Sequence, residues 1–223
     1  MGDWIYLSHY LNPTVPAYGG GDTFQSVELK SIMRGDTCNT SRWIMPNHIG
    51  THIDFPRHFV ENGKSLSDYS PEFWIMNHAL LIDISPKVPS AIINEALFNI
   101  DAVPKDTEIL FIKTGFGSLR NDACYWNAGP VFMPEIADSL RRSCPNIRIM
   151  GCDTISLSSW SNREMGKAAH EAFLNHTHPI LLLEDMNLDK VNRATVFQRV
   201  IVSPLCVSDA DASPCSVLAE VKA

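Results

Sequence analysis

An eleven-residue segment from His48 to His58 places the strongest constraint on this chain, because it gathers three imidazoles and a carboxylate. His48, His52, Asp54 and His58 are separated by even numbers of residues. On an extended backbone, side chains at even spacing point to one face, so the four groups would converge. Neutral imidazole combined with carboxylate suits zinc, manganese or iron(II). The segment therefore predicts a metal site.

The residues between these groups favour an extended segment over a helical one. Gly50 and Pro56 disfavour a helix. His48 and His52 taken alone would also fit an i, i+4 pair on a helix. On an extended backbone, the apolar side chains at odd positions point to the opposite face and are expected in the core: Ile49, Ile53 and Phe55.

The second half of the chain offers groups that could complete such a site. Three ligands leave a metal open for catalysis, or call for distant residues to hold a second ion. Glu184 and Asp153 each follow a short apolar run, so both carboxylates are expected at strand ends that face a crevice. His170 lies in an alanine-rich helical stretch, and His176 and His178 follow its end. The residues alone do not choose among these three histidines.

Composition narrows the classes of function. The chain has 223 residues, 45% of them hydrophobic and 19% charged, which suits a single domain over residues 1–223 with a substantial core. A net charge of −7 provides no basic surface for a phosphate backbone, so no nucleic-acid partner is expected. The apolar runs are too short to span a bilayer and no signal peptide is visible. We therefore expect no membrane partner and a cytoplasmic location.

The six cysteines are scattered, and none forms a Cys-x-x-Cys pair. Their spacing fits neither a zinc ribbon nor a small disulfide scaffold, so we expect reduced thiols. Cys152, beside Asp153, could in principle act as a nucleophile. A small apolar residue at the end of a strand is its expected role.

Strands outnumber helices in the hydrophobic pattern, and the two interleave along the chain. Apolar or alternating runs predict strands at 4–8, 24–29, 78–84, 108–113, 147–151, 179–183, 196–202 and 215–221. Capping residues and helix formers predict helices at 90–98, 134–142 and 164–174. This order predicts an α/β domain with a mixed sheet, curved or barrel-like, and helices packed around it.

The pattern His48-x-Gly-Thr-His52-x-Asp54-x-Pro-x-His58 resembles the motif of the metal-dependent cyclase superfamily. That group includes bacterial kynurenine formamidases (arylformamidases), isatin hydrolases and polyketide-type cyclases. Further similar segments extend along nearly the whole chain: Leu7-Ser8-His9 before a proline-glycine loop, Thr114-Gly115-Phe116 after a strand, Gly151-x-Asp153-Thr154, His170, Leu183-Glu184, and Ser213-Pro214 before the last strand.

The resemblance implies a role for each matching residue. It implies a divalent metal, zinc or manganese, with up to two ions per chain. The implied ligands are His48, His52, Asp54, His170 and Glu184. His58 would be the catalytic acid/base rather than a ligand. The implied fold is a compact α/β unit around a β-barrel-like core, of the swivelling β/β/α type, and the implied assembly is a homodimer.

Three positions in the motif set this chain apart from the family pattern. Ile49 stands where Thr or Gln is usual, and Phe55 stands where Ala is common. A bulky Phe55 either reshapes the pocket or turns into the core. Arg57, beside His58, either makes an outward ion pair, which is the expected case, or contacts an anionic substrate.

The implied activity is hydrolysis of the C–N amide bond of a small aryl formamide or cyclic amide. A bound metal lowers the pKa of water from about 15.7 toward 7 and holds the oxyanion. His58 then passes a proton to the departing nitrogen. One alternative is a cyclase or lyase, or a lactone hydrolase, that acts on a small carbonyl substrate with the same metal. The other is a metal-binding or structural protein that keeps the fold without catalysis. Four aromatic residues could line an aryl pocket or pack elsewhere: Trp4, Tyr18, Phe24 and Trp74.

Overall fold

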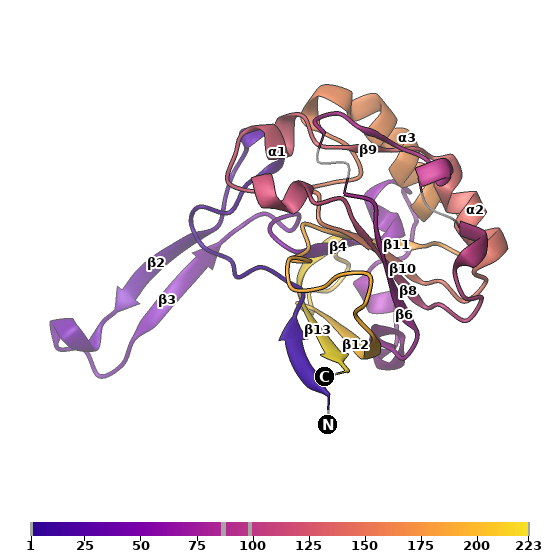
Figure 1. Cartoon of the computed structure of the whole chain (residues 1–223). Helices are drawn as coiled ribbons and strands as arrows, with labels where there is room; N and C mark the ends of the chain where they lie inside the picture. Colours follow the sequence, from indigo (N-terminus) through magenta and orange to yellow (C-terminus); the bar gives the residue numbers. More distant parts are fainter. Residues whose placement is uncertain (1, 86–87, 98–99, 223) are drawn as a thin grey trace.

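The computed structural model describes residues 2–85, 88–97 and 100–222, and a curved mixed sheet forms its centre (Figure 1). The strands are β1 (Asp3–Tyr6), β2 (Gln25–Lys30), β3 (Thr40–Ile44), β4 (His52–Asp54), β5 (Ile75–Met76), β6 (Ala79–Asp83), β7 (Ile92–Ile93), β8 (Ile109–Lys113), β9 (Val131–Phe132), β10 (Ile149–Cys152), β11 (Leu181–Glu184), β12 (Phe197–Pro204) and β13 (Ala212–Val221). The α-helices are α1 (Cys124–Asn127), α2 (Glu135–Ser143) and α3 (Arg163–Leu174).

Nine strands form the main sheet, in the order β5-β12-β13-β4-β11-β10-β8-β6, with β1 also paired to β13. Strands β6, β8, β10 and β11 run parallel to one another. Strand β4 is antiparallel to both β11 and β13 and so joins the parallel half to the antiparallel half. Strands β6 and β12 also approach each other, so the sheet curls into a nearly closed barrel. The expected α/β fold with a barrel-like mixed sheet is confirmed.

Helices α2 and α3 pack together against the sheet (Figure 1). Helix α2 begins after Pro134, has acidic residues in its first turn and carries Arg141 and Arg142 in its last turn, which matches the helix dipole at both ends. Strands β10 and β11 are buried along their whole length, which explains their continuous apolar runs. Within the described ranges, no helix is both long enough and apolar enough to cross a membrane.

All eight predicted strands and two of the three predicted helices are present, with ends shifted by up to three residues. The helix expected at 90–98 is wrong over residues 90–97, and Phe98 lies outside the described residues. Ser90, the expected N-cap, has a left-handed backbone with φ of 55°. The next residues form β7, whose Ile93 is fully buried opposite Phe132 of β9. Burial of a β-branched pair beside a parallel strand prevails over local helix propensity.

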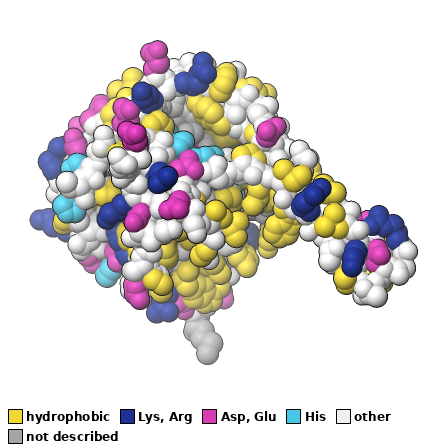
Figure 2. Space-filling view, turned by 180° about the vertical axis from the view of Figure 1, so that it is seen from behind, with side chains coloured by type: hydrophobic (Ala, Val, Ile, Leu, Met, Phe, Trp, Pro, Cys, Tyr) yellow, Lys and Arg dark blue, Asp and Glu magenta, His cyan; other side chains and the backbone are white. Residues whose placement is uncertain are grey.

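Strands β2 and β3 form a two-stranded arm that projects from the body of the molecule (Figure 1). Every residue of both strands is exposed. Figure 2 shows hydrophobic side chains around the base of this arm and charged side chains of both signs toward its tip. The 3₁₀ turn Ile32–Arg34 joins the two strands at that tip.

Candidate metal and active site

The histidine motif lies at the centre of the sheet, but only its middle is a strand. β4 is flanked by β11 and β13 and carries His52 and Asp54. His48 precedes a turn at Gly50, whose φ is 61°, and His58 ends a 3₁₀ helix that begins at Pro56. The expectation of one extended segment is therefore wrong at both ends, because Gly50 adopts a left-handed conformation and Pro56 starts a helical turn. The four side chains still converge on one cavity.

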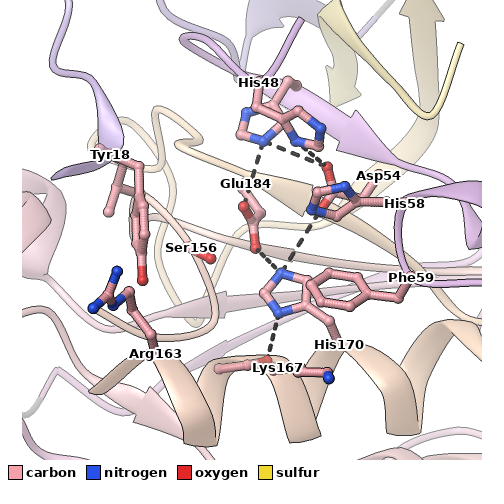
Figure 3. A pocket seen from close by; sticks show the side chains of 13 residues that line it. Tyr18, His48, Asp54, His58, Phe59, Ser156, Arg163, Lys167, His170 and Glu184 are labelled. Carbon is pink, nitrogen blue, oxygen red and sulfur yellow. Dashed lines mark hydrogen bonds and ion pairs between the residues drawn. The ribbon is translucent and has the colours of Figure 1, made fainter. Parts of the chain in front are cut away.

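Glu184 and His170 come from other elements and join this cluster (Figure 3). Glu184 ends β11 and lies opposite His52 in the strand register. Its carboxylate oxygens lie 3.4 Å from His52 Nε2 and 3.2 Å from His170 Nε2. His170 projects from α3, and its Nδ1 lies 2.6 Å from the carbonyl oxygen of Gly166. The structure thus brings together all five residues predicted as ligands.

Asp54 occupies the middle of the cluster. Its Oδ1 lies 3.0 Å from His48 Nδ1 and 3.5 Å from His52 Nε2, and its Oδ2 lies 3.6 Å from His170 Nε2. Both oxygens are buried, and neither makes a hydrogen bond of regular geometry with the described residues, so their nearest polar neighbours are the imidazoles of the cluster. Burying a charged carboxylate costs free energy unless a positive charge or a metal ion lies beside it. This orphaned carboxylate and its imidazole neighbours fit a divalent cation.

Asp54 also belongs to two overlapping sets of residues that could each hold an ion. One set joins it to His48 and His58, and the other joins it to His52 and Glu184. Within each set the donor atoms lie within 4.8 Å of one another. The arrangement therefore has room for one ion or for two that share Asp54, and His58 is placed near one of them.

Backbone carbonyl groups orient two of the histidines. His52 Nδ1 lies 2.8 Å from the carbonyl oxygen of Gly50, and His170 Nδ1 makes the equivalent contact with Gly166. A carbonyl oxygen can only accept, so each Nδ1 carries the proton and donates it. In the neutral ring each Nε2 then keeps the lone pair that a metal would need, and in the protonated ring it donates to the carboxylates of the cluster.

The cluster perturbs the pKa values of its members. Burial opposes a charge on His52 and His170, but Glu184 and Asp54 outweigh it and raise both pKa values. Burial likewise opposes the charge on Glu184, yet the two histidines hold the pKa of this carboxyl well below its usual range. Burial lowers the pKa of His58. His58 is therefore neutral at neutral pH and can accept a proton.

Asp211 belongs to the site and was not identified by sequence reasoning. Its Oδ2 lies 3.1 Å from His48 Nε2 and 3.3 Å from His58 Nδ1, and its Oδ1 accepts a hydrogen bond of 2.6 Å from Asn47 Nδ2. Asp211 directly precedes β13, the neighbour of β4. The available signal was its place just before the Ser213-Pro214 pair.

The cluster forms one end of a cavity of about 470 Å³. Other lining residues that the sequence did not single out for this role are Phe59, Ile155, Ser156, Arg163 and Lys167. Tyr18 also lines the cavity, and its pKa is raised to about 12, mainly by burial, so its hydroxyl stays protonated.

The other three aromatic candidates lie elsewhere. Trp4 is half-exposed on β1, Phe24 belongs to a separate small core, and Trp74 packs on Phe55. Phe55 is fully buried and so turns into the core rather than the cavity, as do Ile49 and Ile53 into their clusters. Arg57 is exposed.

The remaining candidate groups do not face the cavity. Asp153 is buried and accepts hydrogen bonds from Thr114 and from the Gly115 amide, so it fastens a loop. His176 and His178 are exposed after the end of α3. Cys152 is buried away from the cavity, and burial raises the pKa of its thiol, which agrees with its expected role as a small apolar residue at the end of a strand. All six cysteines lie in the described ranges and are unpaired.

Fold and site together define a class of α/β proteins in which a barrel-like sheet carries a buried cluster of histidines and carboxylates at one end of a cavity. Comparison with known proteins identifies the family within this class. A family model described as a putative cyclase matches residues 5–159. Because this match covers more than half of the chain, the chain belongs to the cyclase family, and the resemblance inferred from the motif is confirmed. The chain is therefore a member of a family of enzymes.

Individual relatives agree with this assignment. A kynurenine formamidase of Bacillus cytotoxicus is 28% identical over 212 residues, which cover 95% of this chain and 94% of that protein. A kynurenine formamidase of Bacillus anthracis is 29% identical over 211 residues with the same coverage. Isatin hydrolase A from Labrenzia aggregata, bound to benzyl benzoate, has a TM-score of 0.82 at 23% identity and covers 99% of this chain and 94% of its own. This last likeness shows a shared fold.

Proposed function

We propose that this protein is a metal-dependent hydrolase that cleaves the C–N amide bond of a small aryl formamide or cyclic amide. The observation that carries the proposal is Asp54, a buried carboxylate that faces three imidazoles, makes no hydrogen bond of regular geometry with the described residues, and belongs to both candidate ion sets in one cavity. The names of the relatives, kynurenine formamidase and isatin hydrolase, support amide hydrolysis as the reaction.

The metal ligands of this proposal are His48, His52, Asp54, His170 and Glu184, and the ion is zinc or manganese, with one or two ions per chain. Imidazole and carboxylate donors suit either metal. A divalent ion held there would lower the pKa of a bound water and would stabilise the negative charge that develops on the oxygen of the attacked carbonyl.

His58 moves the proton in this proposal. Burial lowers its pKa, so the neutral imidazole accepts a proton from the attacking water and then donates it to the departing nitrogen. Asp211 contacts Nδ1, which leaves Nε2 as the nitrogen that exchanges the proton. Phe59 and Tyr18 line the cavity and offer ring surfaces to an aryl group.

The family description as a cyclase favours a second candidate, a cyclase, lyase or lactone hydrolase that uses the same centre on a small carbonyl substrate. In this reaction His58 moves a proton without net hydrolysis of an amide. Assays of turnover distinguish the two, because only the first releases an amine.

The test is the variant His58→Gln, with metal content measured by plasma mass spectrometry and turnover measured on N-formylkynurenine and isatin. We expect metal content near the wild-type value and a loss of turnover of about 10²- to 10⁴-fold. His78→Gln is the matched control. His78 is an exposed histidine outside the motif, so this variant should retain activity. Wild-type activity in His58→Gln would refute the acid/base role. If the wild-type protein holds no metal even after reconstitution with zinc or manganese, the proposal itself is refuted.

A further inference from the structure

We propose that the loop of residues 59–64 positions His58 for proton transfer, through the ring of Phe59 at its start and the missing side chain of Gly63 near its end. The inference rests on the proposed function, because it explains how the chain holds the group that moves the proton. Its evidence is the packing of the loop against the turn that carries His58 and involves no contact with a substrate.

His58 lies at the end of a turn that is too short to hold it rigidly alone. The 3₁₀ turn Pro56–His58 has three residues, and hydrogen bonds in such turns have poorer geometry than those of an α-helix. The His58 side chain is 29% exposed, and its Nδ1 contacts Asp211. Because a displacement of about 1 Å can cost a reaction about 100-fold in rate, further contacts must fix this turn.

The ring of Phe59 provides one of these contacts. Its centroid lies 4.4 Å from that of His58 in an edge arrangement of 77°, and 4.9 Å from that of His170 in a stacked arrangement of 28°. Both arrangements are favourable for aromatic rings. Figure 3 shows the Phe59 ring beside that of His170, which the carbonyl oxygen of Gly166 holds on α3. Phe59 therefore fixes the ring of the acid/base relative to a ligand on a rigid helix.

The loop that follows Phe59 returns to the turn and is tied to it by backbone hydrogen bonds. The Val60 amide donates to the Pro56 carbonyl oxygen at 2.9 Å, and the Gly63 amide donates to that of Val60 at 2.8 Å. The Arg57 amide then donates to the Lys64 carbonyl oxygen at 3.0 Å. Both ends of the loop thus contact the turn, so the position of the loop determines where His58 lies.

Gly63 allows this close approach. A Cβ atom at Gly63 would lie 2.6 Å from the carbonyl carbon of Pro56, 2.7 Å from the Arg57 nitrogen and 2.8 Å from the Pro56 oxygen. These are backbone atoms of the turn itself, which cannot rotate away as the end of a side chain can. In the described part of the chain, Gly63 is not one of the glycines with a positive φ, so space rather than backbone conformation requires glycine. A side chain here would push the turn away from the loop and move His58.

The first test is the kinetics of Gly63→Ala on whichever of N-formylkynurenine and isatin the wild type hydrolyses. Among the described residues, Gly63 is not one of those that line the cavity, so the substitution reaches catalysis only through the turn. We expect kcat to fall by about 10- to 100-fold, with KM and metal content near the wild-type values. Asn62→Ala, at the exposed neighbour in the same loop, is the matched control and should keep the wild-type kcat. A loss of metal that matches the loss of kcat would overturn the inference.

A double-mutant cycle with His58→Gln tests whether Gly63 acts through His58. In that background Gly63→Ala should cause no further loss of kcat, because the group that the loop positions is already absent. Equal losses in the two backgrounds would overturn the inference, since they would show an effect on the fold or the metal centre. Phe59→Leu introduces no clash, and it takes the place of Gly63→Ala in the same cycle if circular dichroism shows that Gly63→Ala does not fold.

A spectroscopic measurement separates this inference from the proposed function. Two-dimensional ¹H–¹⁵N spectra of metal-free protein with ¹⁵N-labelled histidine record the ring of His58, whose signals are identified by their loss in His58→Gln. Because the Phe59 ring lies close enough to shift these signals, Gly63→Ala should move them, while those of the exposed His78 stay in place. This result supports the positioning role even if no amide is hydrolysed, which would refute only the hydrolase. Unmoved His58 signals in folded Gly63→Ala would overturn the inference.

Discussion

A single carboxylate, Asp211, touches both a predicted ligand and the predicted acid/base. Its Oδ2 contacts His48 Nε2 and His58 Nδ1, while Asn47 donates to its other oxygen. A carboxylate behind a metal-binding histidine fixes the ring orientation and the tautomer. Asp211 is thus a positioning residue that orients two histidines with different proposed roles.

We predict that Asp211→Asn lowers metal affinity and kcat/KM together, each by about 10- to 100-fold, because both rings lose their charged partner. Metal titration and steady-state kinetics measure the two effects. Asp209→Asn is the control, because Asp209 is exposed and its positive φ of 55° is one that Asn tolerates. Unchanged metal affinity and kinetics in Asp211→Asn would contradict the positioning role.

The histidines of the cluster also predict how the metal-free protein responds to pH. Burial opposes a charge on His48, but Asp54 and Asp211 outweigh it and raise its pKa to about 9. A raised pKa stabilises the folded state fully below pH 6.5, the unfolded value, and this contribution disappears as the pH rises to about 9. We therefore expect the Tm of metal-free protein to fall between pH 6.5 and 9.

The same experiment on metal-loaded protein serves as the comparison. Metal binding requires neutral imidazoles, so metal affinity increases with pH, and the gap in Tm between loaded and metal-free protein should widen over this interval. Thermal unfolding followed by calorimetry at both pH values measures the gap. A constant gap would show that these histidines are already neutral in the metal-free protein.

At the level of elements, the sequence predicts best what is decided by burial. The parallel strands β8, β10 and β11 appear as continuous apolar runs because both of their faces are covered. The arm strand β3 is as exposed as β2, but its sequence lacks the alternation of apolar and polar residues that predicts β2. The segment at 90–97 was misassigned because its strand pairing depends on β9, 39 positions away in the register.

The candidate site also contains residues that local spacing predicts and residues that only the tertiary fold brings to the cavity. The motif places His52 and Asp54 on one face of a short strand, and parity alone predicts that. The choice of His170 over His176 and His178 came from the family resemblance, because nothing local distinguishes the three. Asp211 and Arg163 could not be found from spacing, since the sheet pairing and the docking of α3 bring them to the cavity.

A buried ion pair fastens the end of β11, the strand that positions Glu184. The next residue, Asp185, has a positive φ of 50°, and its carboxylate receives two hydrogen bonds from Arg120, of 2.8 and 2.6 Å, and one from the Tyr125 hydroxyl. We predict that Arg120→Ala lowers the free energy of unfolding by about 3–5 kcal/mol, because it leaves a buried carboxylate without its cation.

Chemical denaturation measures this loss, and an exposed pair in the same chain provides the control. Arg34 and Glu28 lie 2.7 Å apart on the arm, with both side chains 57% exposed. Arg34→Ala should change the free energy of unfolding by no more than about 1 kcal/mol. Equal effects of the two substitutions would show that Asp185 finds another partner when Arg120 is removed.

For the whole molecule, the projecting arm is the feature that a lone chain explains least well. A two-stranded sheet with both faces in water is marginally stable by itself. The arm nevertheless exposes several large apolar side chains: Val27, Leu29, Ile32, Met33, Trp43 and Ile44. The family resemblance implies a homodimer, and an arm of this shape can bury these side chains on a second copy of the chain.

We therefore predict a homodimer whose interface includes the arm, with a mass by light scattering of twice 24.9 kDa. Met33, at the tip, is 98% exposed, and the neighbouring Ile32 is 58% exposed. The double variant Ile32→Ser/Met33→Ser should weaken the dimer, because it removes apolar contacts without disturbing the core, and far-ultraviolet circular dichroism should stay unchanged. Val196→Ser, on the body at a position about as exposed as Ile32, should leave the dimer intact. A wild-type mass of 24.9 kDa across concentrations would instead show that the arm remains uncovered or serves another partner.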